Sequence, residues 1–168
     1  MHKLVTKASF VFTAFIMSAA LCVPGIAMAD ELFKATMTGA SQVPPVVTDT
    51  DGSLHVLVDA GETEIKLTIR VNEGVRVTQA HFHCAPEGSN GPVTAFLAGF
   101  HPRGWDVDGK WISNQTLTSG NVMSVLTADC SIADGRVSDL LAEMRAGNIY
   151  VNVHTIANAP GEIRGQVE

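Results

Sequence analysis

Beyond residue 29 the chain lacks any apolar run of the roughly 18 residues that a membrane-spanning helix requires. The same part of the chain has no Lys/Arg cluster and no basic stripe, which argues against nucleic acid and anionic membranes as partners. It also has no internal repeat and no low-complexity linker. These absences predict one globular domain without a transmembrane segment once the N-terminal region has been removed.

The first 29 residues have the features of a secretory signal peptide. Residues 1–7 form a short cationic segment, and residues 8–24 are apolar apart from Ser and Thr. Ala27-Met28-Ala29 supplies a small-x-small cleavage site, so Asp30 is expected to begin the mature protein. The sequence therefore predicts an exported protein, in the periplasm or the extracellular space.

The remaining residues, 30–168, are expected to form that single domain with a substantial hydrophobic core. Loss of Lys3 and Lys7 leaves 9 basic against 17 acidic residues, a net charge of −8. A negative field favours cations over anionic substrates, but the acidic residues are scattered along the chain. Ordinary solubility is the simpler interpretation of this charge.

Only two cysteines remain after the signal, Cys84 and Cys130, because Cys22 lies in the apolar segment. In an oxidising compartment an even pair predicts one disulfide bond. The alternative is that Cys84 is a thiolate metal ligand beside His83. Strand alternation argues against this alternative, since neighbouring residues of a strand point to opposite faces.

Short alternating or apolar runs separated by turn residues dominate the chain, which is typical of an antiparallel β-sandwich or barrel. A contrasting helical period from Val137 to Met144 predicts one short helix near 136–146. Residues 99–120 are expected to be a long irregular connection, a kind of loop that is often functional. The expected strands are 32–38, 53–59, 64–71, 75–84, 93–98, 121–128, 148–154 and 162–167.

The sharpest indication of function is the sequence His81-Phe82-His83. In a strand, two residues that are two positions apart point to the same face, so both imidazoles can bind one metal ion. Gln79 shares this face, whereas Phe82 points to the other side and into the core. The alternative interpretation is a pair of surface histidines that hydrogen-bond to loop carbonyls.

A third histidine strengthens the metal hypothesis. His154 ends the alternating segment 148–154 and shares a polar strand face with Asn152. If this segment lies beside the strand that carries His81 and His83, three imidazoles can converge on one ion.

Further polar residues could join the site. Arg164 follows a sharp turn and could lie near the histidines, although a structural ion pair with Glu162 is the expected role. His101 lies in the 99–120 connection and is either a fourth ligand or a solvent-exposed loop residue. His55 alternates with apolar residues on its strand and is expected on the surface.

These segments together resemble the CHRD domain, which is named after chordin and occurs in many exported bacterial proteins. The resemblance covers nearly all of the mature chain and implies an immunoglobulin-like β-sandwich, without implying a defined biochemical function. The motifs that carry it are Gly39-Ala-Ser-Gln-Val-Pro-Pro45, Ala80-His-Phe-His83 with Asn90-Gly-Pro92, Tyr150-Val-Asn-Val-His-Thr155, and Pro160-Gly-Glu-Ile-Arg-Gly-Gln166.

A looser similarity links the histidines to the copper site of copper-zinc superoxide dismutases, which are also exported Greek-key β-sandwiches with one disulfide. His81, His83 and His154 would match three copper ligands, and Arg164 is a candidate for an anion-guiding arginine at a different spacing. The chain has no recognisable zinc subsite, because no further His/Asp cluster stands at ligand spacing.

Three imidazoles suit Cu(II) or Zn(II), and the Irving–Williams order places copper first and zinc second. Ligand histidines must be neutral, so binding is expected to weaken as pH falls through about 6. Gln79 and Asn152 are the candidates for orienting the imidazoles, together with Arg164. The three methionines after residue 29 are scattered and do not indicate a copper(I)-binding methionine cluster.

Three hypotheses of function follow. The first is a copper-binding protein of the cell envelope that acts in metal storage, delivery or tolerance, with a protein partner there. The second is a structural or adhesion module whose histidines bind no metal. The third is a copper-dependent redox enzyme of the superoxide dismutase type.

Overall fold

The structure is a computed structural model that describes residues 30–168, and the expected signal peptide, residues 1–29, lies outside the described residues. A 3₁₀ helix, η1 (Ser119–Asn121), and an α-helix, α1 (Val137–Arg145), accompany the strands. The strands are β1 (Glu31–Thr38), β2 (Asp51–Val58), β3 (Glu64–Cys84), β4 (Val93–Ala98), β5 (Trp105–Thr118), β6 (Val125–Thr127), β7 (Cys130–Ile132), β8 (Ile149–Thr155) and β9 (Ile163–Gln166).

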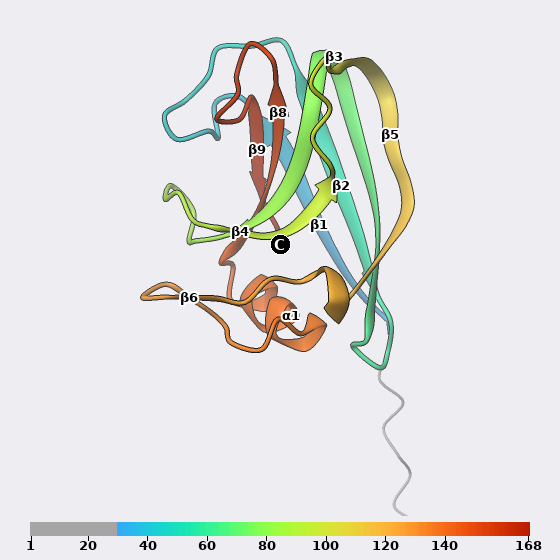
Figure 1. The fold of residues 1–168 in the computed structure, drawn as a ribbon, viewed down its shortest axis with the longest axis vertical. Coiled ribbons are helices and arrows are strands. Elements are labelled where there is room, and N and C mark those ends of the chain that lie inside the picture. The colour runs from blue at the N-terminus through green and yellow to red at the C-terminus, as the bar shows by residue number, and fades with distance from the viewer. Residues whose placement is uncertain (1–29) are drawn as a thin grey trace, which may run out of the picture.

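The main sheet has seven antiparallel strands and closes on itself through β3 (Figure 1). The strand order is β2-β1-β9-β8-β3-β4, and both β2 and β5 also pair with β3. Residues 65–72 of β3 pair with β2, whereas residues 77–84 pair with β8. The predicted all-β antiparallel fold with one short helix is confirmed, and β3 joins its two sandwich-like layers into a barrel-like core.

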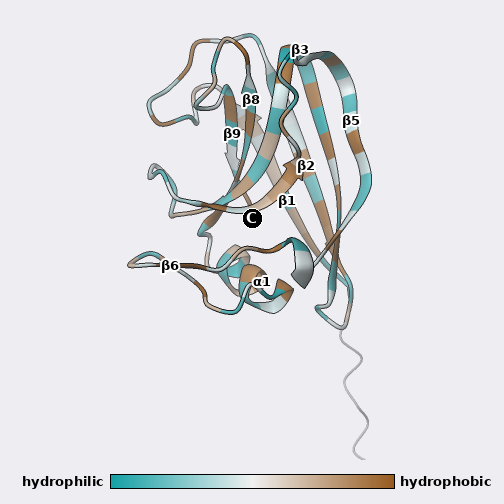
Figure 2. Cartoon of the chain, in the orientation of Figure 1, coloured by the Kyte–Doolittle hydropathy of each residue, from teal (hydrophilic) through white to brown (hydrophobic). Residues whose placement is uncertain are grey.

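Alternation of side chains along the strands builds that core. Ile65, Leu67 and Ile69 on β3 are buried, whereas Lys66 and Arg70 at the alternate positions are exposed. Hydrophobic and hydrophilic residues follow one another in the same way along the neighbouring strands (Figure 2). Burial of one face of each strand supplies the main driving force for this arrangement.

The expected break between strands 64–71 and 75–84 is wrong, because β3 runs through Glu73 and Gly74 without a turn. Glu73 and Arg76 take a left-handed conformation, with φ of 52° each, and the pairing of β3 with β5 shifts register on both sides of Gly74. A Cβ on Gly74 would lie 2.7 Å from the Val71 side chain. The strand therefore bends at an irregular, glycine-dependent point and continues into the other layer.

The expected irregular connection over 99–120 is also wrong in its larger part. Residues 105–118 form β5, an edge strand that pairs with β3 through several register shifts. Conversely, the strand expected over 121–128 is shortened to β6, which pairs only with β7 in a separate two-stranded sheet.

The helix expected near 136–146 is confirmed as α1, which lies with β6 and β7 across one end of the barrel (Figure 1). Its buried side, from Val137 to Met144, packs into the hydrophobic core. The Arg145 guanidinium at its last turn pairs with the carboxylates of Glu31 and Glu62. These ion pairs connect the end of the helix to the first strand and to the loop between β2 and β3.

Within residues 30–168, none of the helices has the length and apolar character needed to cross a bilayer.

Candidate metal centre

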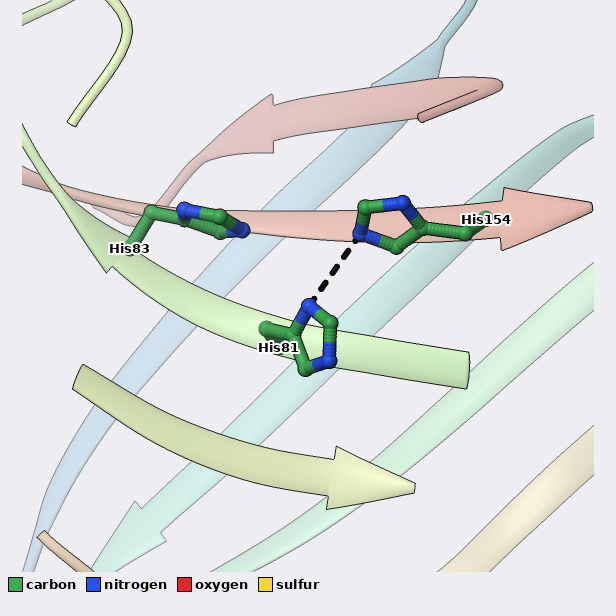
Figure 3. A group of neighbouring side chains, drawn as sticks. All are labelled: His81, His83 and His154. Atoms are coloured by element: carbon green, nitrogen blue, oxygen red, sulfur yellow. Dashed lines mark hydrogen bonds between the residues drawn. The ribbon is translucent and has the colours of Figure 1, made fainter. Parts of the chain in front are cut away.

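The structure brings His81, His83 and His154 together on one face of the sheet (Figure 3). His81 and His83 lie two residues apart on β3, and His154 lies on β8, the neighbouring strand. One ring nitrogen from each residue lies within 4.8 Å of the other two. His81 Nδ1 is 3.1 Å from His154 Nε2, close to the separation of about 3–3.5 Å that two nitrogens have when they share one zinc or copper ion.

Two of the imidazoles are oriented by backbone carbonyls of neighbouring loops. The carbonyl of Gly91 lies 2.9 Å from His83 Nδ1, and the carbonyl of Ala159 lies 2.8 Å from His154 Nδ1. Since a carbonyl only accepts hydrogen bonds, each Nδ1 carries the proton and donates. Both Nε2 atoms are therefore left with a lone pair, which is the form that a metal ligand requires.

The loop that holds the His83 imidazole packs directly against its own strand. A Cβ on Gly91 would lie 2.0 Å from the carbonyl oxygen of Cys84, so only glycine allows this approach. The Gly91 amide also donates to the Tyr150 hydroxyl at 3.1 Å. The glycine of the Asn90-Gly91-Pro92 motif thus fixes the carbonyl that orients His83.

Two imidazole nitrogens of the cluster are buried without a hydrogen-bond partner, His81 Nε2 and His83 Nε2. A buried polar atom without a protein partner is unusual in a folded protein, and such an atom is available to bind an ion, a ligand or a water molecule. The outer side of the His81 ring meets the Phe96 ring edge to face, with centroids 4.6 Å apart. Two members of the cluster are sheltered from solvent, since only 4% of His81 and 6% of His154 is exposed, and His83 is partly buried.

Burial lowers the pKa values of all three imidazoles. Burial, followed by the charges of His154 and His83, lowers the pKa of His81 to about 4. Burial also lowers the pKa of His83 to about 4, although its bond to Gly91 acts in the opposite direction. The pKa of His154 is lowered by burial as well. The cluster is therefore neutral at pH 7. Protons are expected to compete with a metal ion for the imidazole nitrogens at a lower pH than they would for unperturbed histidines.

Tyr150 and Arg164 extend the site on the side of His83. The Tyr150 ring lies parallel to the His83 imidazole, at an angle of 6° and a centroid separation of 4.8 Å. The Arg164 guanidinium lies 3.5 Å from the centroid of the same tyrosine ring. Sequence reasoning placed Arg164 near the histidines but missed Tyr150, although Tyr150 shares the strand face of Asn152 and His154.

Gln79 and Asn152 lie beside the cluster, where strand parity placed them. Gln79 is opposite His154 and Asn152 is opposite His81 in the pairing of β3 with β8. Asn152, however, accepts a 2.7 Å hydrogen bond from Gln42. Among the hydrogen bonds of residues 30–168, His83 and His154 are oriented by loop carbonyls and not by these two side chains.

The expected ion pair between Glu162 and Arg164 is wrong for the part of the chain that the structure describes. The Glu162 carboxylate instead accepts hydrogen bonds from Thr48, Thr50, Thr155 and Asn158. Four such donors favour the ionised form, and the pKa of Glu162 is lowered despite its burial. Glu162 therefore connects the loop before β2, which contains Thr48 and Thr50, to the turn after β8, which contains Asn158.

The other two histidines of residues 30–168 lie outside the cluster. His101 stacks on Trp105, with ring centroids 3.9 Å apart, and its backbone amide donates to the carbonyl of Thr78. His101 is not part of the group of three histidines whose ligand atoms lie within 4.8 Å of one another. His55 is exposed on β2, as strand alternation predicted.

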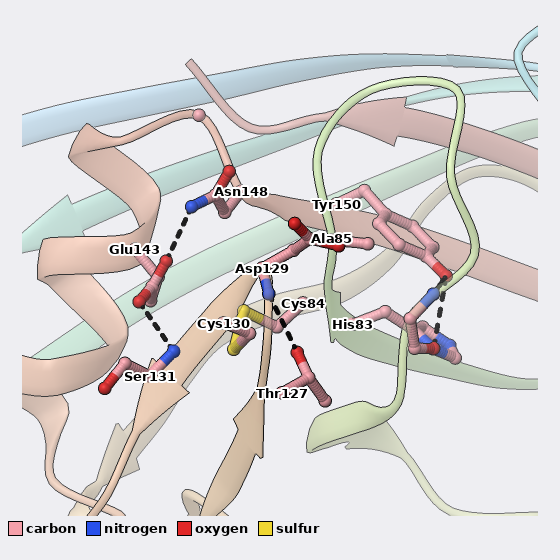
Figure 4. The surroundings of a disulfide bond; sticks show 12 residues. His83, Cys84, Ala85, Thr127, Asp129, Cys130, Ser131, Glu143, Asn148 and Tyr150 are labelled. Atoms are coloured by element: carbon pink, nitrogen blue, oxygen red, sulfur yellow. Dashed lines mark hydrogen bonds between the residues drawn. A yellow bond between two sulfur atoms is a disulfide. The ribbon is translucent and has the colours of Figure 1, made fainter.

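Cys84 and Cys130 form the predicted disulfide, with Cα atoms 5.9 Å apart (Figure 4). Both residues are buried in the hydrophobic core, which Cys84 enters from the strand face opposite His81 and His83. Glu143 lies nearby, but its carboxylate accepts hydrogen bonds from the Ser131 amide and the Asn148 side chain (Figure 4). The disulfide is thus separate from the histidine cluster, as expected from the sequence.

The fold and the site define an all-β protein with a barrel-like core and a sheltered three-histidine cluster. The CHRD domain family matches residues 33–167. Because this match spans most of the chain, the protein belongs to the CHRD domain family, which confirms the resemblance drawn from its motifs. No curated protein and no solved structure matches the chain.

Proposed function

We propose that this CHRD-domain protein binds one transition metal ion, copper in the first place and zinc in the second, through His81, His83 and His154. The observation that supports it best is the convergence of three neutral imidazoles from two neighbouring strands, with the Nε2 atom of His83 buried and without a hydrogen-bond partner. Imidazole is a good ligand for both metals, and the Irving–Williams order ranks Cu(II) above Zn(II).

The proposed role is metal handling in the cell envelope, as storage, delivery or tolerance, which includes a protein partner there for transfer. A disulfide-bonded domain is compatible with an oxidising, extracytoplasmic location. Export itself rests on the expected signal peptide and is tested by sequencing the N-terminus of the exported protein, which should begin at Asp30.

The test of metal binding is a calorimetric titration of residues 30–168 with copper or zinc. One equivalent should bind to the wild type, and His81→Ala, His83→Ala and His154→Ala should each weaken binding by at least tenfold. His55→Ala is the matched control, because His55 is an exposed strand histidine far outside the cluster. Absence of stoichiometric binding, or wild-type affinity in all three cluster variants, would refute the proposal.

A second candidate function is adhesion or ligand binding without a metal. Several large apolar side chains near the cluster are exposed: Phe96 (50%), Phe100 (66%), Trp105 (45%) and Ile156 (40%). Scattered exposure of this kind is common, but a contiguous patch would fit a protein partner. A partner that binds chelator-treated protein as tightly as metal-loaded protein would favour this candidate.

A redox function of the superoxide dismutase type is the third candidate, supported by the similarity of the ligand pattern to the copper site of those enzymes. It requires an open coordination position and access for a small reactant. A superoxide assay on the copper-loaded protein, beside His154→Ala, separates this enzyme function from metal binding alone.

A further inference from the structure

His83, Tyr150 and Arg164 form a three-layered stack that leads from the histidine cluster to a buried positive charge. The tyrosine ring lies 4.8 Å from the His83 ring on one side and 3.5 Å from the Arg164 guanidinium carbon on the other. Arg164 is only 2% exposed and Tyr150 is also 2% exposed. A full positive charge is therefore fixed one aromatic ring behind a candidate metal ligand, in a region from which water is largely excluded.

The charge of Arg164 has no direct counter-ion. Its guanidinium donates to the carbonyl of Ser89 and to the side-chain oxygen of Asn90, both of which are neutral. The ion pairs found within residues 30–168 involve Arg136 and Arg145 only. The carboxylate of Glu87 acts on Arg164 from a distance, but this residue is exposed, so solvent weakens its effect.

The histidine cluster offers no negative charge either. Its ligand group contains three imidazoles and no carboxylate or thiolate. Arg164 lowers the pKa of His83 further, and no carboxylate of residues 30–168 is among the groups that shift the pKa values of the three rings. An ion bound here would keep its whole charge in a sheltered environment, where each additional unit of charge is unfavourable.

We propose that this site holds copper as Cu(I) in preference to Cu(II), and that Arg164, acting through the stack with Tyr150 and His83, contributes to this preference. The inference rests on the proposed metal site and adds the oxidation state that the site selects. Bound Cu(II) becomes Cu(I) by gaining one electron from an external one-electron reductant such as ascorbate, which is oxidised in turn, and the three imidazole ligands can remain in place. Solvent access and local charge are general controls on the potential of a bound metal.

Arg164 is a positioning and electrostatic residue in this proposal, since it does not touch the ion. At the effective dielectric constant of about 20 that fits protein charges, a unit charge at roughly 10 Å changes the relative affinity for two ions that differ by one charge about tenfold. Removing the arginine charge should therefore change the ratio of Cu(I) affinity to Cu(II) affinity more than it changes the stability of the domain.

The test measures two dissociation constants. Cu(I) affinity is obtained without oxygen, in ascorbate, by competition with bicinchoninate, and Cu(II) affinity by competition with glycine. The wild type should bind Cu(I) at least tenfold more tightly than Cu(II). Arg164→Gln should reduce this ratio about tenfold, which is a fall of about 59 mV in the one-electron potential. Arg164→Lys keeps the charge and should stay within about threefold of the wild-type ratio.

Equal or tighter binding of Cu(II) by the wild type would overturn the inference, and this comparison does not depend on any variant. Thermal unfolding shows whether the Arg164→Gln protein is folded. If the folded variant keeps the wild-type ratio of Cu(I) to Cu(II) affinity, Arg164 does not contribute to the preference. If neither copper ion binds, the proposed metal site itself fails. The failure of the site and the failure of the oxidation-state preference are therefore distinguishable.

Discussion

At the scale of single residues, the buried imidazoles make the stability of the metal-free protein depend on pH. Unfolded histidines bind protons below about pH 6.5, whereas folded His81 and His83, with pKa values near 4, stay neutral. Between these values the unfolded chain binds more protons, so the free energy of unfolding falls as the pH falls. We expect a loss of about 2–5 kcal/mol from pH 7 to 4.5, measured by urea denaturation in the presence of a chelator.

The same measurement on His81→Gln and His83→Gln provides the control. Neither glutamine titrates in this range, so each variant should show a shallower dependence of stability on pH than the wild type. A wild-type free energy of unfolding that is equal at pH 7 and 4.5 would contradict the sheltered, neutral cluster.

Gly91→Ala tests the carbonyl that orients His83. The new methyl group would lie 2.0 Å from the Cys84 carbonyl oxygen, so the loop must move. We expect a loss of stability of about 1–3 kcal/mol, as for other overpacked sites. We also expect metal affinity to fall by about 10–100-fold, since the His83 ring loses its hydrogen-bond acceptor.

Gly99→Ala is the matched control, because a Cβ on Gly99 meets nothing within 4 Å. It should leave the free energy of unfolding within about 0.5 kcal/mol of the wild type, as most surface substitutions do, and the metal affinity within about twofold. Unchanged metal binding in Gly91→Ala would show that the Gly91 carbonyl does not set the ligand geometry.

The candidate ligands could be predicted from the sequence because strand parity is a local property. His81 and His83 face the same side, and Cys84 faces the other, whatever the register of the neighbouring strands. The groups that orient the rings could not be predicted in the same way. The carbonyls of Gly91 and Ala159 belong to loops, every residue has a carbonyl, and only the tertiary fold decides which one reaches an imidazole.

At the scale of elements, the disulfide connects the end of β3 to β7, the hairpin strand beside α1. The two cysteines are separated by 46 residues, and closing a loop of this length in the unfolded chain contributes about 2–4 kcal/mol to stability. Cys84→Ala/Cys130→Ala should lose stability in this range in urea denaturation. Its metal affinity should be retained, because Cys84 points away from the histidines.

A folded double cysteine variant that binds no metal would contradict this separation of roles. The thermal unfolding of the apo variant must be measured first, so that binding is compared only at temperatures where the domain is folded.

The errors in predicting elements have a common cause in the irregular pairing of β3 with β5. Glu73-Gly74 resembles a turn in sequence, yet a strand can bulge and bend at such residues without ending. Trp105–Thr118 is an edge strand with mostly exposed or half-buried side chains, and Asn114 in it has a left-handed φ of 53°. Val107, Trp111 and Ile112 are only partly buried against the core, and register shifts interrupt the alternation of the strand. Its pairing therefore depends on residues distant in the sequence.

At the scale of the whole molecule, a bound ion would join β3, the strand through which the sheet closes, to its neighbour β8. His81 and His83 belong to β3, which pairs with strands of both layers, and His154 belongs to β8. An ion that binds only the folded state should stabilise it by about 2.7 kcal/mol at a free concentration of 100 times the dissociation constant. Thermal unfolding followed by circular dichroism should therefore show a higher Tm when metal is added.

The rise in Tm should be clearly smaller in His154→Ala, which retains the pair on β3 but loses the ligand on β8. It should be retained in His55→Ala, where an exposed histidine is removed. An equal rise in the wild type and His154→Ala would indicate that the metal binds elsewhere on the protein.

The chain contains one tyrosine, and this is the residue between His83 and Arg164. Every tyrosine signal in the ultraviolet spectrum of the protein therefore arises from one ring at the edge of the candidate metal centre. The two tryptophans lie on β5 and absorb at longer wavelengths, so the contributions can be resolved. Tyr150 is therefore an intrinsic optical probe of this position, and the binding of an ion can be followed through its absorbance without a label.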